Sequence, residues 1–185
     1  TVSLKSTGSY DIAVPSMDWR LGGDIGHPIS NVAVQDGSDA VGAYSEISFD
    51  YFVAGGRHGA IRAYRDRRAL LFTVKYIDTA ANTEPFPTFT RYPAGLNHLT
   101  FSGIFAAPSF TALSNESPWV FFDAKANAFV LSSASHFMTS GSELAMSGAI
   151  TSGISPRITS LPAGFTQATL LVMEDGVNAA YETWG

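Results

Sequence analysis

The residues of this 185-residue sequence that could bind metal ions or transfer protons show no spacing typical of a metal site. The four histidines lack the short helical or loop spacing of a motif such as HExxH, and they are His27, His58, His98 and His136. Asp18, Asp24 and His27 do lie close together, in the stretch PSMDWRLGGDIGHPIS, where carboxylate oxygens could hold a hard cation. The glycines and prolines of that stretch instead favour a turn-rich loop, in which Asp is common for conformational reasons. We therefore predict no metal site.

Nucleophilic catalysis has no recognisable signature either. The sequence contains no Cys, which excludes thiol nucleophiles, thiolate metal ligands and disulfides. It contains no G-x-S-x-G stretch, and the glycine-rich run GGRHG at 55–59 lacks the spacing of a phosphate-binding loop. A glycosidase carboxylate pair cannot be recognised from spacing alone, and Glu46 and Asp50 alternate with apolar residues as the solvent-facing residues of a strand do. We assign no catalytic residue and no cofactor.

A cluster of arginines is the main anomaly in the distribution of charge. Five of the eleven Lys and Arg residues fall within twelve positions, and they are Arg57, Arg62, Arg65, Arg67 and Arg68. One interpretation is a solvated hairpin tip. The other is an interface between domains or subunits, because the guanidinium fork pairs well with carboxylates. The net charge of −5 and the shortness of the cluster argue against a nucleic-acid partner.

Tryptophans are the candidates for carbohydrate contact, because a flat aromatic face can stack on a sugar ring. Trp19 lies in the glycine-rich stretch, and we expect it to face a sugar or a neighbouring domain, with Asp18 and Arg20 as polar neighbours. Trp119 follows Ser117-Pro118 and opens an apolar run. It is a second platform candidate, although its neighbours Val-Phe-Phe favour packing in the core.

Alternation of apolar and polar residues dominates the chain and predicts β-strands. The stretch AYSEISFDYFVA, at 43–54, is one strand. Two hairpins are predicted, one with a tip at 65–68 between 61–64 and 70–77, and one with a tip at 123–127 between 120–122 and 129–131. Further strands are expected at 99–106, 143–154, 157–161 and 165–174, and prolines fall between the apolar runs. We predict an all-β fold, an antiparallel β-sandwich spanning residues 1–175.

The last ten residues, GVNAAYETWG, depart from this pattern. Val177, Ala180 and Tyr181 have the i, i+3, i+4 spacing of a helical face, which predicts a short helix within 176–185. A helix of this length is marginal in water, so Val177, Tyr181 and Trp184 should find apolar cover in the sandwich, in a neighbouring copy or, in a longer chain, in a following domain; without such cover we expect the segment to be unordered. Tyr181 and Trp184 are therefore interface candidates.

The overall composition fits one globular domain. Hydrophobic residues make up 45% of the chain and charged residues only 15%, and no run approaches the roughly 20 apolar residues that span a bilayer. We expect no membrane partner. The sequence begins at Thr1 with neither an initiator Met nor a leader, so the compartment stays open between a processed secreted protein and a fragment, with secretion favoured.

Three stretches together resemble the N-terminal β-domain of clan D glycoside hydrolases, the α-galactosidase-like and raffinose-synthase-like enzymes. They are FDYFVAGGRHGAIRAYRDRRALLFTVKYID, ESPWVFFDAKANAFVLSSASHFM and LPAGFTQATLLVMEDGVNAAYETWG. In these enzymes a β-supersandwich precedes a (β/α)₈ barrel, and a helical linker joins the two. The resemblance implies that residues 176–185 begin this linker, towards a barrel C-terminal to Gly185.

The resemblance also implies a function. The catalytic aspartates of such enzymes lie on barrel strands, so none is carried over, and the chain would be a non-catalytic portion that supports the barrel and contributes to binding a galactoside or oligosaccharide. One alternative is a free-standing, lectin-like carbohydrate-binding sandwich. Another is a structural or interaction domain that oligomerises through Trp184 and the arginine hairpin.

Overall fold

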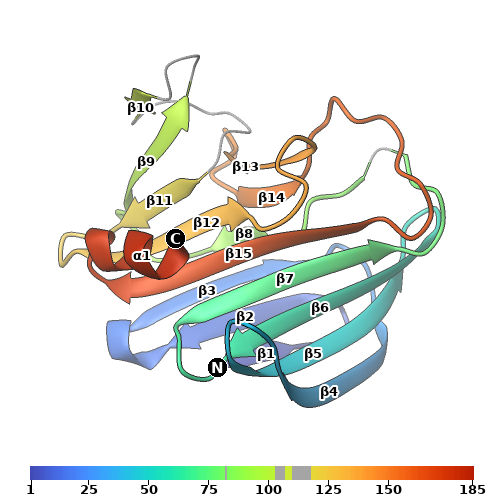
Figure 1. Ribbon diagram of the computed structural model, residues 1–185, viewed down its shortest axis with the longest axis horizontal. Helices are drawn as coiled ribbons and strands as arrows, with labels where there is room; N and C mark the ends of the chain where they lie inside the picture. Colours follow the sequence, from blue (N-terminus) through green and yellow to red (C-terminus); the bar gives the residue numbers. More distant parts are fainter. Residues whose placement is uncertain (82, 103–106, 110–117) are drawn as a thin grey trace.

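Two antiparallel β-sheets packed face to face make up this chain (Figure 1). The structure is a computed structural model that describes residues 1–81, 83–102, 107–109 and 118–185. It confirms the predicted all-β sandwich with a short helix at the C-terminal end.

The smaller sheet has six strands, in the spatial order β1-β2-β3-β8-β14-β13. Their bounds are β1 Val2–Leu4, β2 Ser9–Val14, β3 Trp19–Asp24, β8 Thr88–Arg91, β14 Ile150–Ile154 and β13 Ser140–Leu144. A 3₁₀ turn, Pro15–Met17, joins β2 to β3. Most of this sheet comes from segments in which the sequence pattern had predicted no strand.

The larger sheet has nine strands, in the order β10-β9-β11-β12-β15-β7-β6-β5-β4. Their bounds are β10 Ala107–Ser109, β9 Asn97–Ser102, β11 Trp119–Phe122, β12 Asn127–Ser133, β15 Thr166–Asp175, β7 Ala69–Tyr76, β6 Gly56–Tyr64, β5 Ala43–Phe52 and β4 Ser30–Ser38. Strands β7 and β15 pair with each other near the middle of this sheet.

Both predicted hairpins are confirmed, as β6–β7 and β11–β12, and so are the strands at 43–54 and 165–174. The prediction for 143–154 is wrong in part, because a turn at 145–149 divides it into β13 and β14. Residues 157–161 form no strand and make only one bridge, between Leu161 and Ala80. Of the strand predicted at 99–106, residues 97–102 form β9, and 103–106 lie outside the described residues.

An aromatic layer fills the centre of the sandwich. Tyr10 and Phe89 come from the smaller sheet, Phe49 and Phe72 from the larger sheet, and Phe86 from the segment that leads into β8. Each of these side chains is at most 2% exposed. Phe86 lies edge-on to Tyr10, Phe49 and Phe72, with ring centroids 5.5–6.0 Å apart, an arrangement that aromatic pairs prefer.

Helix α1, Val177–Trp184, packs on the outer face of the larger sheet, against β12 and β15 (Figure 1). Ala180 is fully buried there, in a cluster with Val120, Ala128 and Val130. Thr183 donates a hydrogen bond of 3.1 Å to Glu174 of β15. The apolar cover that this helix needs therefore comes from the sandwich. With eight residues α1 is far too short to cross a bilayer, and the part of the chain that the structure describes holds no membrane-spanning helix.

Replacing Tyr10 by Phe should lower the free energy of unfolding by about 1–3 kcal/mol. The hydroxyl of Tyr10 donates to the carbonyl of Thr88 (2.6 Å) and accepts from its N–H (2.9 Å), so both backbone groups of β8 would lose their partner. Urea denaturation measures the loss. The matched control is Tyr181→Phe, whose buried hydroxyl makes no hydrogen bond to the described residues and should be dispensable. Equal midpoints for the two variants would contradict the role given to the Tyr10 hydroxyl.

Candidate interaction groove

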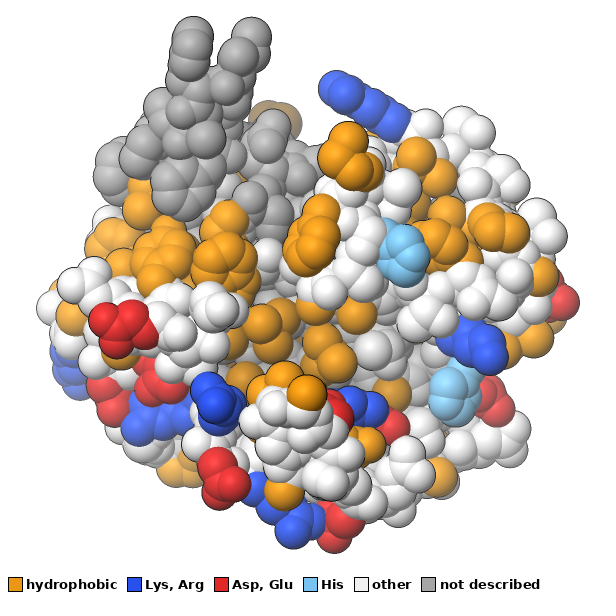
Figure 2. Space-filling view, in the orientation of Figure 1, with side chains coloured by type: hydrophobic (Ala, Val, Ile, Leu, Met, Phe, Trp, Pro, Cys, Tyr) orange, Lys and Arg blue, Asp and Glu red, His pale blue; other side chains and the backbone are white. Residues whose placement is uncertain are grey.

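A groove of about 430 Å³ lies on the outer face of the larger sheet, beside the C-terminal end of α1. Its floor is formed by β7 and β15, through Ala69, Leu71, Leu170 and Val172. Its walls and rim come from α1, from the loop between β4 and β5 and from the β6–β7 hairpin, through Trp184, Val41, Tyr64 and Arg67. Figure 2 shows this face, with hydrophobic side chains gathered in a central hollow over β7 and β15.

The floor is apolar because β7 and β15 carry hydrophobic side chains on both faces. Leu70 and Leu171 point into the sandwich, where they are at most 5% exposed. Their neighbours Leu71 and Leu170 are paired across the two strands and point outward. For this reason the sequences of the two strands, ALLFTV and TLLVM, are apolar at nearly every position instead of alternating between apolar and polar residues. Helix α1 covers only part of this outer face, and the groove is the remainder.

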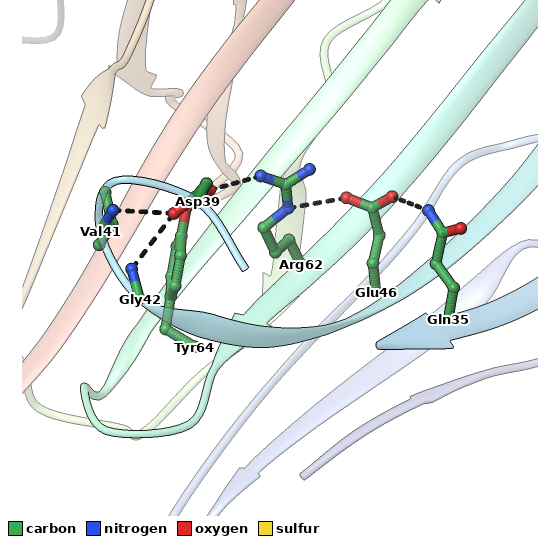
Figure 3. Close-up of polar contacts among 7 residues, drawn as sticks. All are labelled: Gln35, Asp39, Val41, Gly42, Glu46, Arg62 and Tyr64. Atoms are coloured by element: carbon green, nitrogen blue, oxygen red, sulfur yellow. Dashed lines mark hydrogen bonds and ion pairs between the residues drawn. The ribbon is translucent and has the colours of Figure 1, made fainter. Parts of the chain in front are cut away.

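One wall of the groove is held by the carboxylate of Asp39 (Figure 3). It accepts hydrogen bonds from the backbone N–H groups of Val41 (2.8 Å) and Gly42 (3.2 Å). It also accepts from Tyr64 Oη (2.9 Å) and Arg62 Nη1 (2.7 Å). Desolvation raises the pKa of Asp39, but these hydrogen bonds outweigh it and hold the pKa below the usual range. The loop at 39–42 is thereby fixed to β6.

The same network continues across three strands to β4 (Figure 3). Arg62 Nε donates to Glu46 (2.8 Å), and Glu46 accepts a second hydrogen bond from Gln35 (2.9 Å). The guanidinium carbon of Arg62 lies 3.8 Å from the centroid of the Tyr44 ring. Glu46 is only 8% exposed, so its assignment as a solvent-facing residue is wrong. Its cross-strand partner is Arg62, and this pairing could not be read from the alternation within one strand.

The five arginines occupy different environments. Arg57 is 2% exposed, because it lies on the inward face of β6, where it pairs with Glu84 (3.3 Å) and stacks on Tyr76. It cannot contact a partner, which corrects our expectation for this residue. Two arginines near the hairpin tip form ion pairs, Arg65 with Asp36 (2.6 Å) and Arg68 with Asp175 (2.8 Å).

Arg67 is exposed and lines the groove together with Trp184. Tyr181 is half-buried and lies edge-on to Trp184, with ring centroids 6.3 Å apart. The structure therefore places the hairpin tip and the C-terminal helix, both of which the sequence indicates as contact candidates, around one groove. It adds Val41 and Tyr64 to this surface. Both lie in short segments whose sequence gives no sign of contact across strands.

Trp19 is not in a loop, and our expectation that it faces a partner is wrong. It opens β3, is 4% exposed, and donates a hydrogen bond from its indole nitrogen to Asp123 (3.2 Å). Asp18, which ends the 3₁₀ turn with a φ of 55°, and Arg20, which follows Trp19 in β3, are both exposed. Gly23, one of the glycines that suggested a loop, serves close packing, since a Cβ on it would lie 1.6 Å from the carbonyl oxygen of Thr88 in β8.

Trp119 is fully buried, which confirms the core interpretation that its neighbours favoured. Its indole nitrogen donates to the carbonyl of Ser142 (3.0 Å), and its ring stacks on Phe121. In the stretch considered for a cation, the carboxylate of Asp24 accepts from the N–H of Gly26 (2.6 Å), which closes a tight turn. No three His, Asp or Glu side chains among the described residues are arranged to hold a metal ion.

Solved structures with a similar fold are known. No family model and no curated protein matches the sequence. Among solved structures, the chain is similar to a glycoside hydrolase family 97 enzyme from Pseudoalteromonas sp. strain K8 in complex with acarbose, with a TM-score of 0.56, 8% identity, and 95% of this chain and 35% of that chain covered. It is also similar to a family 36 α-galactosidase from Geobacillus stearothermophilus, with a TM-score of 0.57, 12% identity, and 85% and 29% covered.

A third similar structure is an α-N-acetylgalactosaminidase from Bifidobacterium bifidum, with a TM-score of 0.58, 9% identity, and 99% and 36% covered. At these identities the likeness is one of fold. It confirms, at the level of fold, the resemblance to the β-sandwich of glycoside hydrolases. The chain spans about a third of the length of each of these enzymes.

Replacing Trp19 by Ala should cost about 3–5 kcal/mol of unfolding free energy, the scale of truncating a buried aromatic. The variant also leaves the Asp123 carboxylate without its indole donor. Chemical denaturation followed by circular dichroism measures the change. Arg20→Ala, one residue away and exposed, is the control and should stay within about 0.5 kcal/mol of the wild type. A small loss for Trp19→Ala would mean that the indole is not part of the core.

Replacing Asp39 by Ala should speed hydrogen exchange at the amides of Val41 and Gly42, because both lose their acceptor. Asp50→Ala, which removes a carboxylate from the far end of β5, should leave that exchange unchanged. Since the folded-state pKa of Asp39 is lowered, its contribution is present above the ordinary Asp pKa and is lost as the pH falls through the lowered value. If the amides of Val41 and Gly42 exchange at the same rate in both variants at neutral pH, Asp39 does not hold the loop.

Proposed function

We propose that residues 1–175 form the non-catalytic β-sandwich of a carbohydrate-active enzyme, a glycoside hydrolase related to the α-galactosidases and raffinose synthases. In this proposal residues 176–185 begin a linker helix, and the sandwich supports a catalytic barrel that follows Gly185. The proposal rests on comparing how much of this chain and how much of each similar enzyme the structural match covers. The similar enzymes match 85–99% of this chain, while the chain matches only 29–36% of theirs.

The groove supports the same proposal from a different direction. The groove is an apolar surface that lies beside the one covered by α1 and is itself uncovered. Trp184 forms one side of the groove. Arg67 makes no ion pair with the described residues and stands at the rim, where it could meet a carboxylate of a neighbouring domain. Apolar floor, aromatic wall and Arg rim are a composition typical of protein interfaces.

The carboxylates around the groove are unsuited to acid–base catalysis. Asp39 and Glu46 are bound by Arg62, and Asp175 is bound by Arg68. The lowered pKa of Asp39 keeps this carboxylate ionised at neutral pH, which makes it a poor general acid. The site therefore serves contact better than chemistry.

The lectin-like alternative has one observation in its favour, the presence of Trp184, Tyr64 and Arg67 around one groove. Its floor is aliphatic, however, and offers no side-chain donors or acceptors for sugar hydroxyls. A protein surface is the better occupant.

The purified 185-residue chain should show no hydrolysis of raffinose or of 4-nitrophenyl α-galactoside. The product of the same gene, carried past residue 185, should hydrolyse one of these or a related glycoside. Hydrolysis by the 185-residue chain that is lost when a single Asp or Glu is replaced would overturn the proposal. A reading frame that stops directly after the codon for Gly185 would overturn it as well. Tight galactoside binding by this chain, abolished by Trp184→Ala, would favour the lectin-like alternative.

A further inference from the structure

Within the described residues, one sheet edge is much longer than the others. The smaller sheet ends in β1, with three residues, and in β13, with five. The larger sheet ends in β10, with three residues, and in β4, with nine. Short edge strands limit unwanted pairing, because an open edge presents a row of unpaired backbone N–H and C=O groups. Among the described strands, β4 is the edge that does not follow this rule.

β4 is also uncovered on its faces. Eight of its nine residues are exposed, and Val32 and Val34 are 53% and 69% exposed. Val34 lies opposite Ile47 of β5, and Ile47 lies opposite Ile61 of β6, so the three form one row on the inner face of the sheet. Ile61 is 1% exposed and Ile47 is half-buried. Cover by the smaller sheet therefore runs out along this row before it reaches β4.

The devices that usually protect an edge are confined to the start of β4. Asn31 has a φ of 49°, and the register with β5 shifts between Ser30 and Ala33. The first residues of the edge strand are therefore distorted. From Ala33 to Ser38 the pairing with β5 is regular. This part contains neither Lys nor Pro, and its single charge, Asp36, is paired with Arg65 at 2.6 Å.

We propose that the β4 edge pairs with β4 of a second copy of this chain, antiparallel and centred on Val34. This register sets Val34 against Val34 of the second copy and Ala33 against Gln35, all within the regular part of the edge, and it sets Val32, from the shifted part, against Asp36. It joins the two apolar rows into one that runs from Ile61 through both Val34 side chains to Ile61 of the other copy. No like charges face each other, and Asn31, which breaks the regular ladder, lies outside the paired segment. The edge is complementary to itself, which favours a symmetric dimer. The pairing does not depend on the function proposed above.

The mass in solution tests this dimer. Light scattering coupled to size exclusion should give about twice 19.7 kDa for the wild type. Val34→Lys should return the mass to that of a monomer with an unchanged circular-dichroism spectrum, because Val34 is exposed within each copy and the fold does not depend on it. Met146→Lys, at a 93% exposed site in the turn between β13 and β14, is the control and should stay dimeric. A wild type that is monomeric at every soluble concentration, or a dimeric Val34→Lys, would overturn the proposal.

The absence of cysteine allows a second test of the register. Residues directly opposed in an antiparallel pair have Cα atoms about 4.5–5.5 Å apart, within the span of a disulfide. Val34→Cys should therefore form a covalent dimer under mild oxidation. Ala33→Cys is the matched control, because the two copies of residue 33 would be diagonal neighbours about 7–8 Å apart, which is too far. Equal cross-linking at both positions, or at neither, would contradict the pairing centred on Val34.

Discussion

The structure depends on one constraint, which is that β7 and β15 must be covered on both faces. Their inward side chains, such as Phe72 and Leu171, are buried against the smaller sheet by the aromatic layer around Tyr10. Their outward side chains, such as Val172 and Leu170, cannot be covered by that sheet. Helix α1 covers part of this outer face, and the groove lies over the part beside it. The burial of apolar area on the two faces thus positions the smaller sheet on one side and α1 on the other.

The sequence predicts the larger sheet well and the smaller sheet poorly. The β6–β7 and β11–β12 hairpins are local, so their apolar runs and polar tips are visible within a few residues of each other. The smaller sheet is held together by β8, which pairs with β3 on one side and β14 on the other, and these pairings join segments far apart in the chain that no local pattern records. Trp19 was misplaced for this reason. The glycines beside it allow β8 to approach closely, and they resemble turn glycines until that neighbour is known.

The candidate site divides in the same way. Trp184 and Tyr181 could be predicted as contact residues, because a short amphipathic helix has to find apolar cover. The role of Asp39 could not, because its partners lie on β6 and its sequence neighbours indicate only a turn. The arginine cluster shows the limit of counting charges. Within a single strand, Arg57 points into the core and Arg62 points outward, so closeness in sequence says nothing of a shared surface.

The hydrogen-bond network in Figure 3 has a mechanical consequence. Its one end holds the loop that forms a wall of the groove, and its other end is Gln35, on the strand at the open edge of the sheet. Asp39, Arg62 and Glu46 connect these two ends through direct contacts of 2.7–2.9 Å, with no flexible segment between them. Any displacement of the loop that keeps these hydrogen bonds must also move side chains on the edge strand. The two surfaces are therefore mechanically coupled, and the guanidinium of Arg62 is the central link.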